Sequence, residues 1–185
     1  SADLYCGNSG TTMRLLMGLV SGRGVNARLT GDDSLSRRPM ERVAAPLRLL
    51  GADIRTQNGC APVEIAAARL CGARVDTRVA SAQVKSAVIL AALGAKGETL
   101  VHEDIKTRDH TERMLAAMGA DIRVAGTDVF VGESDLTAME VEVPGDISSA
   151  AYFLALGALR GEVLCKNVGV NPTRTGILEA FSRMN

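Results

Sequence analysis

"RLLGADIRTQNG", residues 48–59, recurs as "AAMGADIRVAGT" at residues 116–127, and this repeat decides the predicted fold. The two GADIR strings begin at Gly51 and Gly119, so the offset between the copies is 119 − 51 = 68 residues. Each glycine follows an amphipathic stretch with apolar residues at helical spacing, and glycine often ends a helix in this position. We expect a short strand, a turn and a second strand after each glycine.

Each copy also has a helix and a strand upstream of this stretch. In the first copy the helix is expected at residues 10–21, followed by the strand "VNARLTG". In the second copy the helix is expected at residues 81–94, followed by "ETLVHED". A third copy begins at "DISSAAYFLALGALRGEVLCKNV" and breaks off in a helical pattern. We therefore predict an α/β fold of repeated helix–strand–helix–strand–strand units, two complete and one truncated.

The composition limits the classes of function. Of the 185 residues, 46% are hydrophobic and 3% aromatic, so a core of aliphatic side chains is expected. The 21 basic residues balance the 21 acidic ones, which argues against a nucleic-acid surface but allows a local basic pocket for a small anion. The longest apolar run, residues 87–94, is too short to cross a membrane. The chain does not begin with Met and both ends interrupt a pattern, so we expect a fragment of a longer protein.

The cysteines argue against a zinc site and against a disulfide framework, because none of them has CxxC spacing. This usage indicates a reducing, cytosolic setting. The four residues are Cys6, Cys60, Cys71 and Cys165.

Three of the expected helices begin with small and hydroxylated residues. They begin in "YCGNSGTTMRLL" (residues 5–16), "ASAQVKSA" (80–87) and "GDISSAAY" (145–152), and the first of these runs directly into Arg14. The free N–H groups of a first helical turn carry partial positive charge, so an anion can approach them where no bulky side chain intervenes. The alternative is that these Ser, Thr and Asn residues only cap the helices.

Arginines stand at the starts of the next helices, in "GDDSLSRRPM" and "IKTRDHTE". These residues, Arg37, Arg38 and Arg108, oppose the helix macrodipole, so a local structural advantage is hard to find. A guanidinium that grips a phosphate or carboxylate in bidentate fashion would justify the cost. The alternative is a surface salt bridge with a neighbouring carboxylate. The candidates are Asp32, Asp33, Asp109 and Glu112.

Together these strings resemble the 3-phosphoshikimate 1-carboxyvinyltransferase (EPSP synthase) family. The matching strings are "GNSGTTMRLL", "LTGDDSLSRRPM", "ASAQVKSAVILAAL", "IKTRDHTERML", "VPGDISSAAYFL" and "NPTRTG", in the family's order and spacing across essentially the whole chain. The forms of "ASAQVKSA" and "TRDHTE" are similar to the bacterial branch called class II. The resemblance implies the family's fold, with inner helices and outer sheets. Residues 1–144 would be the second and third units of its first lobe, and residues 145–185 the start of its second lobe.

The resemblance also implies a reaction. The enolpyruvyl group of phosphoenolpyruvate is transferred to the 5-hydroxyl of shikimate 3-phosphate, with release of phosphate, in aromatic amino acid biosynthesis. No cofactor, metal, nucleic acid or membrane is implied, and the full-length enzyme would be a cytoplasmic monomer and a target of glyphosate. The catalytic acid and base of the family would lie outside this chain. The fragment alone is therefore expected to be inactive, and its truncated unit to expose an apolar face that favours self-association.

The resemblance assigns substrate contacts residue by residue. Gly10 matches the glycine that lies against phosphoenolpyruvate, and Arg38 matches the arginine that binds its anionic groups. Asn8 and Thr11 flank the same pocket. Gln83 is expected to reach both substrates. The residues implied around shikimate 3-phosphate are Ser81, Ala82, Gln83 and Arg108.

Two other functions stay open at this point. UDP-N-acetylglucosamine 1-carboxyvinyltransferase has the same fold, but it is expected to carry a reactive cysteine in a loop where this chain has "GDDSLSRRPM", without cysteine. A non-enzymatic repeat scaffold that binds a partner protein would have no reason to bind shikimate 3-phosphate.

Overall fold

A computed structural model describes residues 2–184 of the chain. The contacts divide the chain into two compact units, Ser1–Thr137 and Ala138–Asn185. The first unit contains both predicted complete repeats, and the second contains the truncated one. The expected lobe boundary after residue 144 stays a prediction.

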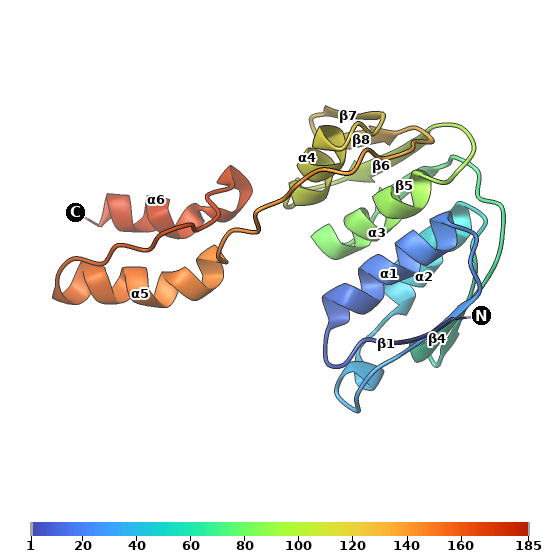
Figure 1. The fold of residues 1–185 in the computed structure, drawn as a ribbon, viewed down its shortest axis with the longest axis horizontal. Helices are drawn as coiled ribbons and strands as arrows, with labels where there is room; N and C mark the ends of the chain where they lie inside the picture. The colour runs from blue at the N-terminus through green and yellow to red at the C-terminus, as the bar shows by residue number, and fades with distance from the viewer. Residues whose placement is uncertain (1, 185) are drawn as a thin grey trace. The chain divides into compact units, whose positions relative to one another are not determined.

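The first repeat forms a four-stranded mixed sheet with two helices (Figure 1). The strand order is β1-β2-β4-β3, in which β1 and β2 are parallel and the other neighbours are antiparallel. The elements are β1 (Ala2–Tyr5), α1 (Gly10–Gly22), β2 (Ala27–Thr30), the 3-10 helix η1 (Leu35–Arg37), α2 (Glu41–Leu49), β3 (Asp53–Gln57) and β4 (Cys60–Ala66).

The second repeat has the same topology, with the strand order β5-β6-β8-β7 and the same parallel and antiparallel pairings. Its elements are β5 (Arg74–Thr77), α3 (Ala82–Ala92), β6 (Thr99–Glu103), α4 (His110–Ala117), β7 (Ile122–Ala125) and β8 (Asp128–Val131). The predicted helix–strand–helix–strand–strand order is therefore confirmed in both repeats. The glycines of the GADIR strings have φ of +95° and +86°, as a helix-ending glycine requires.

The predicted unit was incomplete, because each repeat begins with an additional edge strand, β1 or β5. Each of these strands has four residues, and alternate side chains face solvent. In β5, for example, Val75 and Thr77 are buried while Arg74 and Asp76 are exposed. Two inward side chains are too few to give a readable strand period, so only pairing with β2 or β6 makes these segments strands.

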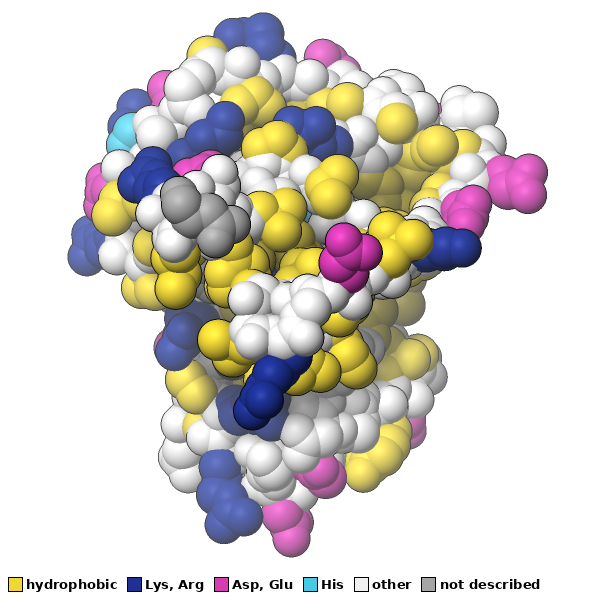
Figure 2. All heavy atoms as spheres, turned by 90° about the vertical axis from the view of Figure 1, so that its left-hand side faces the viewer, with side chains coloured by type: hydrophobic (Ala, Val, Ile, Leu, Met, Phe, Trp, Pro, Cys, Tyr) yellow, Lys and Arg dark blue, Asp and Glu magenta, His cyan; other side chains and the backbone are white. Residues whose placement is uncertain are grey.

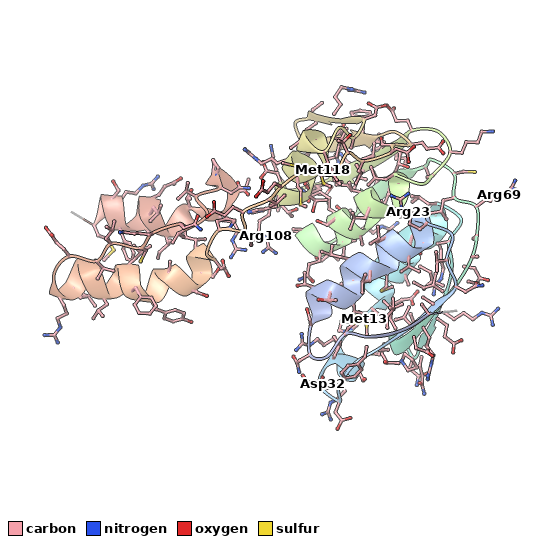
Figure 3. The ribbon with its side chains drawn as sticks, viewed as in Figure 1. Met13, Arg23, Asp32, Arg69, Arg108 and Met118 are labelled. Carbon is pink, nitrogen blue, oxygen red and sulfur yellow. The ribbon has the colours of Figure 1, made fainter. Side chains whose placement is uncertain are left out.

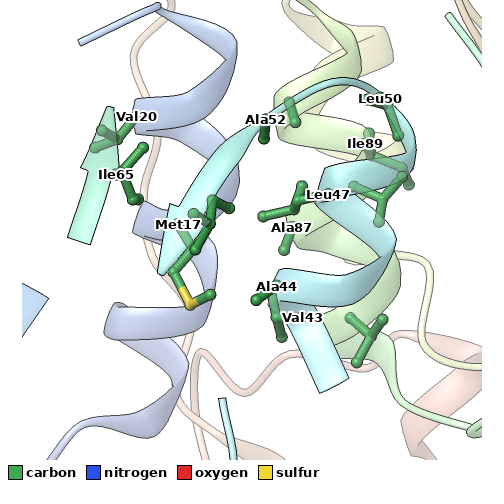
Figure 4. Close-up of a cluster of buried hydrophobic side chains, with 14 of the residues drawn as sticks. Met17, Val20, Val43, Ala44, Leu47, Leu50, Ala52, Ile65, Ala87 and Ile89 are labelled. Atoms are coloured by element: carbon green, nitrogen blue, oxygen red, sulfur yellow. The ribbon is translucent and has the colours of Figure 1, made fainter. Parts of the chain in front are cut away.

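The helices lie inside the first unit and the sheets lie outside. Helix α3 is buried along nearly its whole length, and α1 packs directly against it. The close-up of the core shows Met17 of α1, Leu47 of α2 and Ala87 of α3 among the packed side chains (Figure 4). The outward faces of the strands carry exposed charged residues such as Arg28 and Glu64. Apolar burial between the layers supplies the main stabilisation.

The second unit consists of α5 (Ile147–Arg160), the 3-10 helix η2 (Pro172–Arg174) and α6 (Gly176–Arg183). The strand expected after α5 does not form. A single backbone bridge joins Gly145, which precedes α5, to Val168, which follows it. The bridge is isolated, so no ladder of neighbouring pairs stabilises a strand between these two segments.

Apolar side chains of the second unit are exposed. Large hydrophobic residues along α5 reach the surface, and Figure 2 shows hydrophobic side chains between charges of both signs on the face that it presents. The exposed large hydrophobic residues of α5 are Tyr152, Phe153, Leu156 and Leu159. The apolar surface expected for the truncated unit is present, and self-association through it stays a prediction.

Candidate anion-binding site

Helix α1 begins with a capped but bare first turn. Ser9 is the N-cap, with φ −88° and ψ 98°, and its Oγ accepts a hydrogen bond of 3.1 Å from the N–H of Thr12. The capping alternative is therefore correct for Ser9. Capping does not use the N–H groups of Gly10 and Thr11, the first two helical residues, so their partial positive charge stays at the helix start.

Two guanidinium groups lie against Gly10. A Cβ atom built at Gly10 would lie 3.2 Å from Nη1 of Arg38 and 3.4 Å from Nη1 of Arg14. Arg38 also donates a hydrogen bond of 2.5 Å to Oδ1 of Asn8, and Asn8 donates one of 2.7 Å to Asp32. Asn8 thus orients the Arg38 guanidinium toward the bare helix start, and glycine leaves room for both cations.

Gln83 links this cluster to the start of α3. Its Oε1 accepts a hydrogen bond of 2.5 Å from Arg14, and its Nε2 donates one of 2.7 Å to Oγ1 of Thr11. The predicted residues Asn8, Gly10, Thr11, Arg38 and Gln83 therefore lie in one connected group.

The cluster gathers several positive charges, and the Asp32 carboxylate interacts with Arg38 only from beyond ion-pair distance. Burial first, and then the charges of Arg42 and Arg38, lower the pKa of Arg14. Among residues 2–184, no carboxylate lies within 4.0 Å of the guanidinium nitrogens of these three arginines. Nε of Arg14 is buried without a hydrogen-bond partner in this part of the chain. A bound anion would relieve both the repulsion and the missing contact.

Asp32 is an acidic member of the network. Hydrogen bonds from the N–H of Leu35 and from Asn8 hold the pKa of Asp32 below its usual value. Asp32 is therefore ionised near neutral pH. Its carboxylate accepts a hydrogen bond from the side-chain amide of Asn8, and Asn8 in turn orients Arg38. Figure 3 shows Asp32 in the loop that follows β2.

The salt-bridge alternative for the arginines of the two loops fails in this structure. Asp109 pairs with Arg113 at 2.9 Å, and Glu112 pairs with Lys85 at 2.7 Å. Within the described residues, neither Arg38 nor Arg108 has a carboxylate within 4.0 Å. Their charges remain open to a ligand.

The residues predicted around the second substrate lie at the start of α3 and in the loop before α4. Ser81 is the N-cap of α3 but makes no side-chain capping bond, so its hydroxyl is open to a ligand, and Ala82 is the first helical residue. Arg108 is exposed in the loop after β6 (Figure 3). A hydrogen bond of 2.6 Å between Ser86 and Thr111 holds the start of α4 against α3. The structure records no direct contact between Arg108 and Ser81.

The other repeats indicate where Arg108 points. Arg174 stands two residues before α6, as Arg108 stands two residues before α4. Arg174 reaches back to the start of α5, where it pairs with Asp146 at 3.0 Å and contacts Ser148. Arg38 reaches the start of α1 in the same way. By this internal comparison, Arg108 is expected to face the start of α3.

Arg14 is the site residue that sequence reasoning missed. It was visible in "GNSGTTMRLL" as an arginine in the first turns of a helix, where it opposes the macrodipole as Arg38 was argued to do. No site was assigned to it because its partner Gln83 is 69 residues away.

Two classes of site have no support within residues 2–184. There, no three His, Cys, Asp or Glu side chains gather as metal ligands. No helix among these residues is long and apolar enough to span a bilayer.

Comparisons with known proteins identify the family of this chain. The EPSP synthase (3-phosphoshikimate 1-carboxyvinyltransferase) family model matches residues 1–185. The 3-phosphoshikimate 1-carboxyvinyltransferase of Desulfitobacterium hafniense is 54% identical over 98% of this chain, and that of Bacillus subtilis is 49% identical over 98%. The chain covers 43% and 44% of these two proteins.

A solved structure shows the same fold. EPSP synthase from Acinetobacter baumannii superposes on the whole of this chain with a TM-score of 0.90 and 49% sequence identity, and the chain covers 43% of it. The matches span all the motifs that build the anion-binding cluster and the inner-helix fold. This chain belongs to the EPSP synthase family.

Proposed function

We propose that this chain supplies part of the substrate cleft of a 3-phosphoshikimate 1-carboxyvinyltransferase. The observation that carries the proposal is the bare start of α1, where Gly10 lies under the guanidinium groups of Arg14 and Arg38 and no carboxylate of residues 2–184 lies within 4.0 Å of either. We further propose a cytoplasmic and monomeric full-length enzyme, whose partners are shikimate 3-phosphate and phosphoenolpyruvate.

The two substrates would meet at Gln83. Phosphoenolpyruvate would lie against Gly10 with its anionic groups on Arg38 and Arg14, and Asn8 and Thr11 at its side. Shikimate 3-phosphate would lie on the start of α3, with its phosphate on Arg108. The remaining contacts for it are Ser81, Ala82 and Gln83.

The chemistry requires two anions to come together. The methylene carbon of phosphoenolpyruvate gains a proton and becomes a methyl group, while the 5-hydroxyl of shikimate 3-phosphate attacks the adjacent carbon and loses its proton. Phosphate then leaves the tetrahedral intermediate as the methyl group loses a proton, which restores the C=C bond of the enolpyruvyl group. The residues of this chain would orient both substrates and offset their mutual repulsion. We assign no catalytic acid or base to it.

The function is tested with the full-length protein by measuring phosphate release from phosphoenolpyruvate. We expect release that depends on shikimate 3-phosphate and not on UDP-N-acetylglucosamine. Release only with the UDP-sugar would support the sister transferase instead. The absence of release with either acceptor, together with no heat of binding for shikimate 3-phosphate, would favour a scaffold.

Gly10→Ala tests the role of the bare helix start. The new methyl group would lie 3.2 Å from Nη1 of Arg38, so the arginine must move. The methyl group would also fill part of the space in which the anion is proposed to bind. We expect a higher KM for phosphoenolpyruvate and, because glyphosate is longer, a larger rise in its inhibition constant. If the site were only a cap, helix stability would change by about 1 kcal/mol or less and both constants would stay unchanged. Inhibition curves at matched substrate saturation decide the question.

A further inference from the structure

One lysine of the helical layer is completely enclosed with two carboxylates. The side chain of Lys85 is 1% exposed, and its Nζ lies 2.8 Å from Glu103 and 2.7 Å from Glu112. Both glutamates are also buried. The substrate contacts proposed above do not use this cluster, which we call the Lys85 cluster.

The Lys85 cluster joins the two parts of the proposed shikimate 3-phosphate site. Lys85 lies one helical turn after Ser81 in α3. Glu103 ends β6, and its carboxylate accepts hydrogen bonds from the backbone N–H of Thr107 at 3.4 Å and from the hydroxyl of the same residue. Glu112 lies in the first turn of α4. The segment that carries Arg108 is therefore fixed at both of its ends to the helix that carries Ser81.

The first repeat has uncharged residues at the positions equivalent to those of the Lys85 cluster. Met13 stands four residues after the N-cap Ser9, as Lys85 stands four residues after the N-cap Ser81. Leu29 pairs with Val63 of β4 as Val101 pairs with Val129 of β8, so Gly31, two residues after Leu29, corresponds to Glu103.

The third position follows from the GADIR offset of 68 residues, which places Ala44 opposite Glu112. None of the corresponding residues of the first repeat is charged: Met13 and Ala44 have 0% exposure and belong to the hydrophobic core, and Gly31 has no side chain. The repeat fold therefore does not need an ion cluster at this place.

The charges are also costly where they lie. Burying ions costs several kcal/mol each unless their partners compensate, and well-packed apolar residues often do as well or better. The cluster holds one lysine and two glutamates, and Oε2 of Glu112 is buried without a hydrogen-bond partner among the described residues. Stability alone is thus a poor explanation for these three residues.

We propose that Lys85 is a positioning residue for shikimate 3-phosphate. Through Glu103 and Glu112 it sets the distance between the start of α3 and the Arg108 segment, so that both can contact the same phosphate. Ion pairs and the Thr107 bonds define this distance more sharply than apolar packing would, because they are directional. The proposal rests on the function proposed above.

Thr107→Val tests the link to Arg108 with the least disturbance. The change removes the hydroxyl bond to Glu103 and touches no proposed substrate contact. In the full-length protein we expect KM for shikimate 3-phosphate to rise about fivefold, the effect of one lost hydrogen bond, with KM for phosphoenolpyruvate unchanged. The matched control is Thr56→Val, which removes a threonine–glutamate bond in the first sheet and should leave both constants unchanged.

A double-mutant cycle tests Lys85 itself. Lys85→Met should raise KM for shikimate 3-phosphate about tenfold in the wild-type background, but add little to Arg108→Ala, because Lys85 acts through Arg108. The exposed Lys96, beyond the far end of α3, gives the control Lys96→Met. Circular dichroism and the urea midpoint check that each variant is folded. If Lys85→Met does not fold, the Thr107→Val result decides.

Three outcomes would overturn the inference. The first is an unchanged KM for shikimate 3-phosphate in Thr107→Val, and the second is an equal rise of this KM on Lys85→Met in the wild-type and Arg108→Ala backgrounds. Provided that the wild-type protein turns over shikimate 3-phosphate, either outcome would overturn this inference alone. A wild-type protein that does not turn it over would overturn the proposed function and this inference with it.

Discussion

Gly18→Ala is expected to destabilise the protein by about 3 kcal/mol or more, the upper part of the range for overpacked cores. A Cβ atom at Gly18 of α1 would lie 2.0 Å from the carbonyl oxygen and 2.7 Å from the carbonyl carbon of Ala87 in α3. No rotamer change relieves a clash with backbone, so the two inner helices must separate. Because they form the centre of the first unit, their packing with both sheets would loosen as well.

Urea unfolding of the full-length protein measures this effect. Natural domains are stable by only about 5–15 kcal/mol, so the midpoint should fall strongly or the variant should not accumulate in folded form. Gly176→Ala is the matched control, since nothing lies within 4 Å of a Cβ atom there, and a helical alanine should be neutral or stabilising by up to about 1 kcal/mol. A Gly18→Ala midpoint equal to that of the wild type would show that α1 and α3 do not pack this closely.

Arg38→Met is expected to lower kcat/KM for phosphoenolpyruvate roughly 10²- to 10³-fold, equivalent to about 3–4 kcal/mol. Arg38 is held over Gly10 by Asn8 and has no carboxylate partner among the described residues, so its charge is available to the substrate. Methionine retains an unbranched side chain of similar length but removes every donor. The loss should therefore come from missing charge-assisted bonds rather than from packing.

Steady-state kinetics with each substrate varied in turn separates this effect from a general one. Arg37→Met is the control, because Arg37 is the adjacent arginine, ends η1 and is exposed. We expect its constants to stay within about twofold of the wild type, as for an ordinary surface change. Equal losses in both variants would mean that the loop contributes only diffuse positive charge, and no loss in Arg38→Met would remove Arg38 from the site.

The sequence by itself determined the repeat and the order of the two helices and three strands that follow the edge strand in each copy. Gly51 and Gly119 adopt the positive φ that ends a helix, and the apolar spacing before them and the strands after them are local signals. The bare helix start at Gly10 and the arginine at residue 38 were also readable, because glycine and a guanidinium at a helix amino terminus are locally unfavourable and need a reason.

Only the tertiary structure decided which of these residues meet. The edge strands β1 and β5 are too short to be read from a period, and they exist because β2 and β6 supply their hydrogen bonds. Arg14 joins the site through Gln83, 69 residues away, and Lys85 is enclosed by carboxylates from a strand and a second helix. Local patterns report the preference of a segment for helix, strand or turn. They carry no information on which distant side chain fills the space beside it, because packing of the repeats sets that choice.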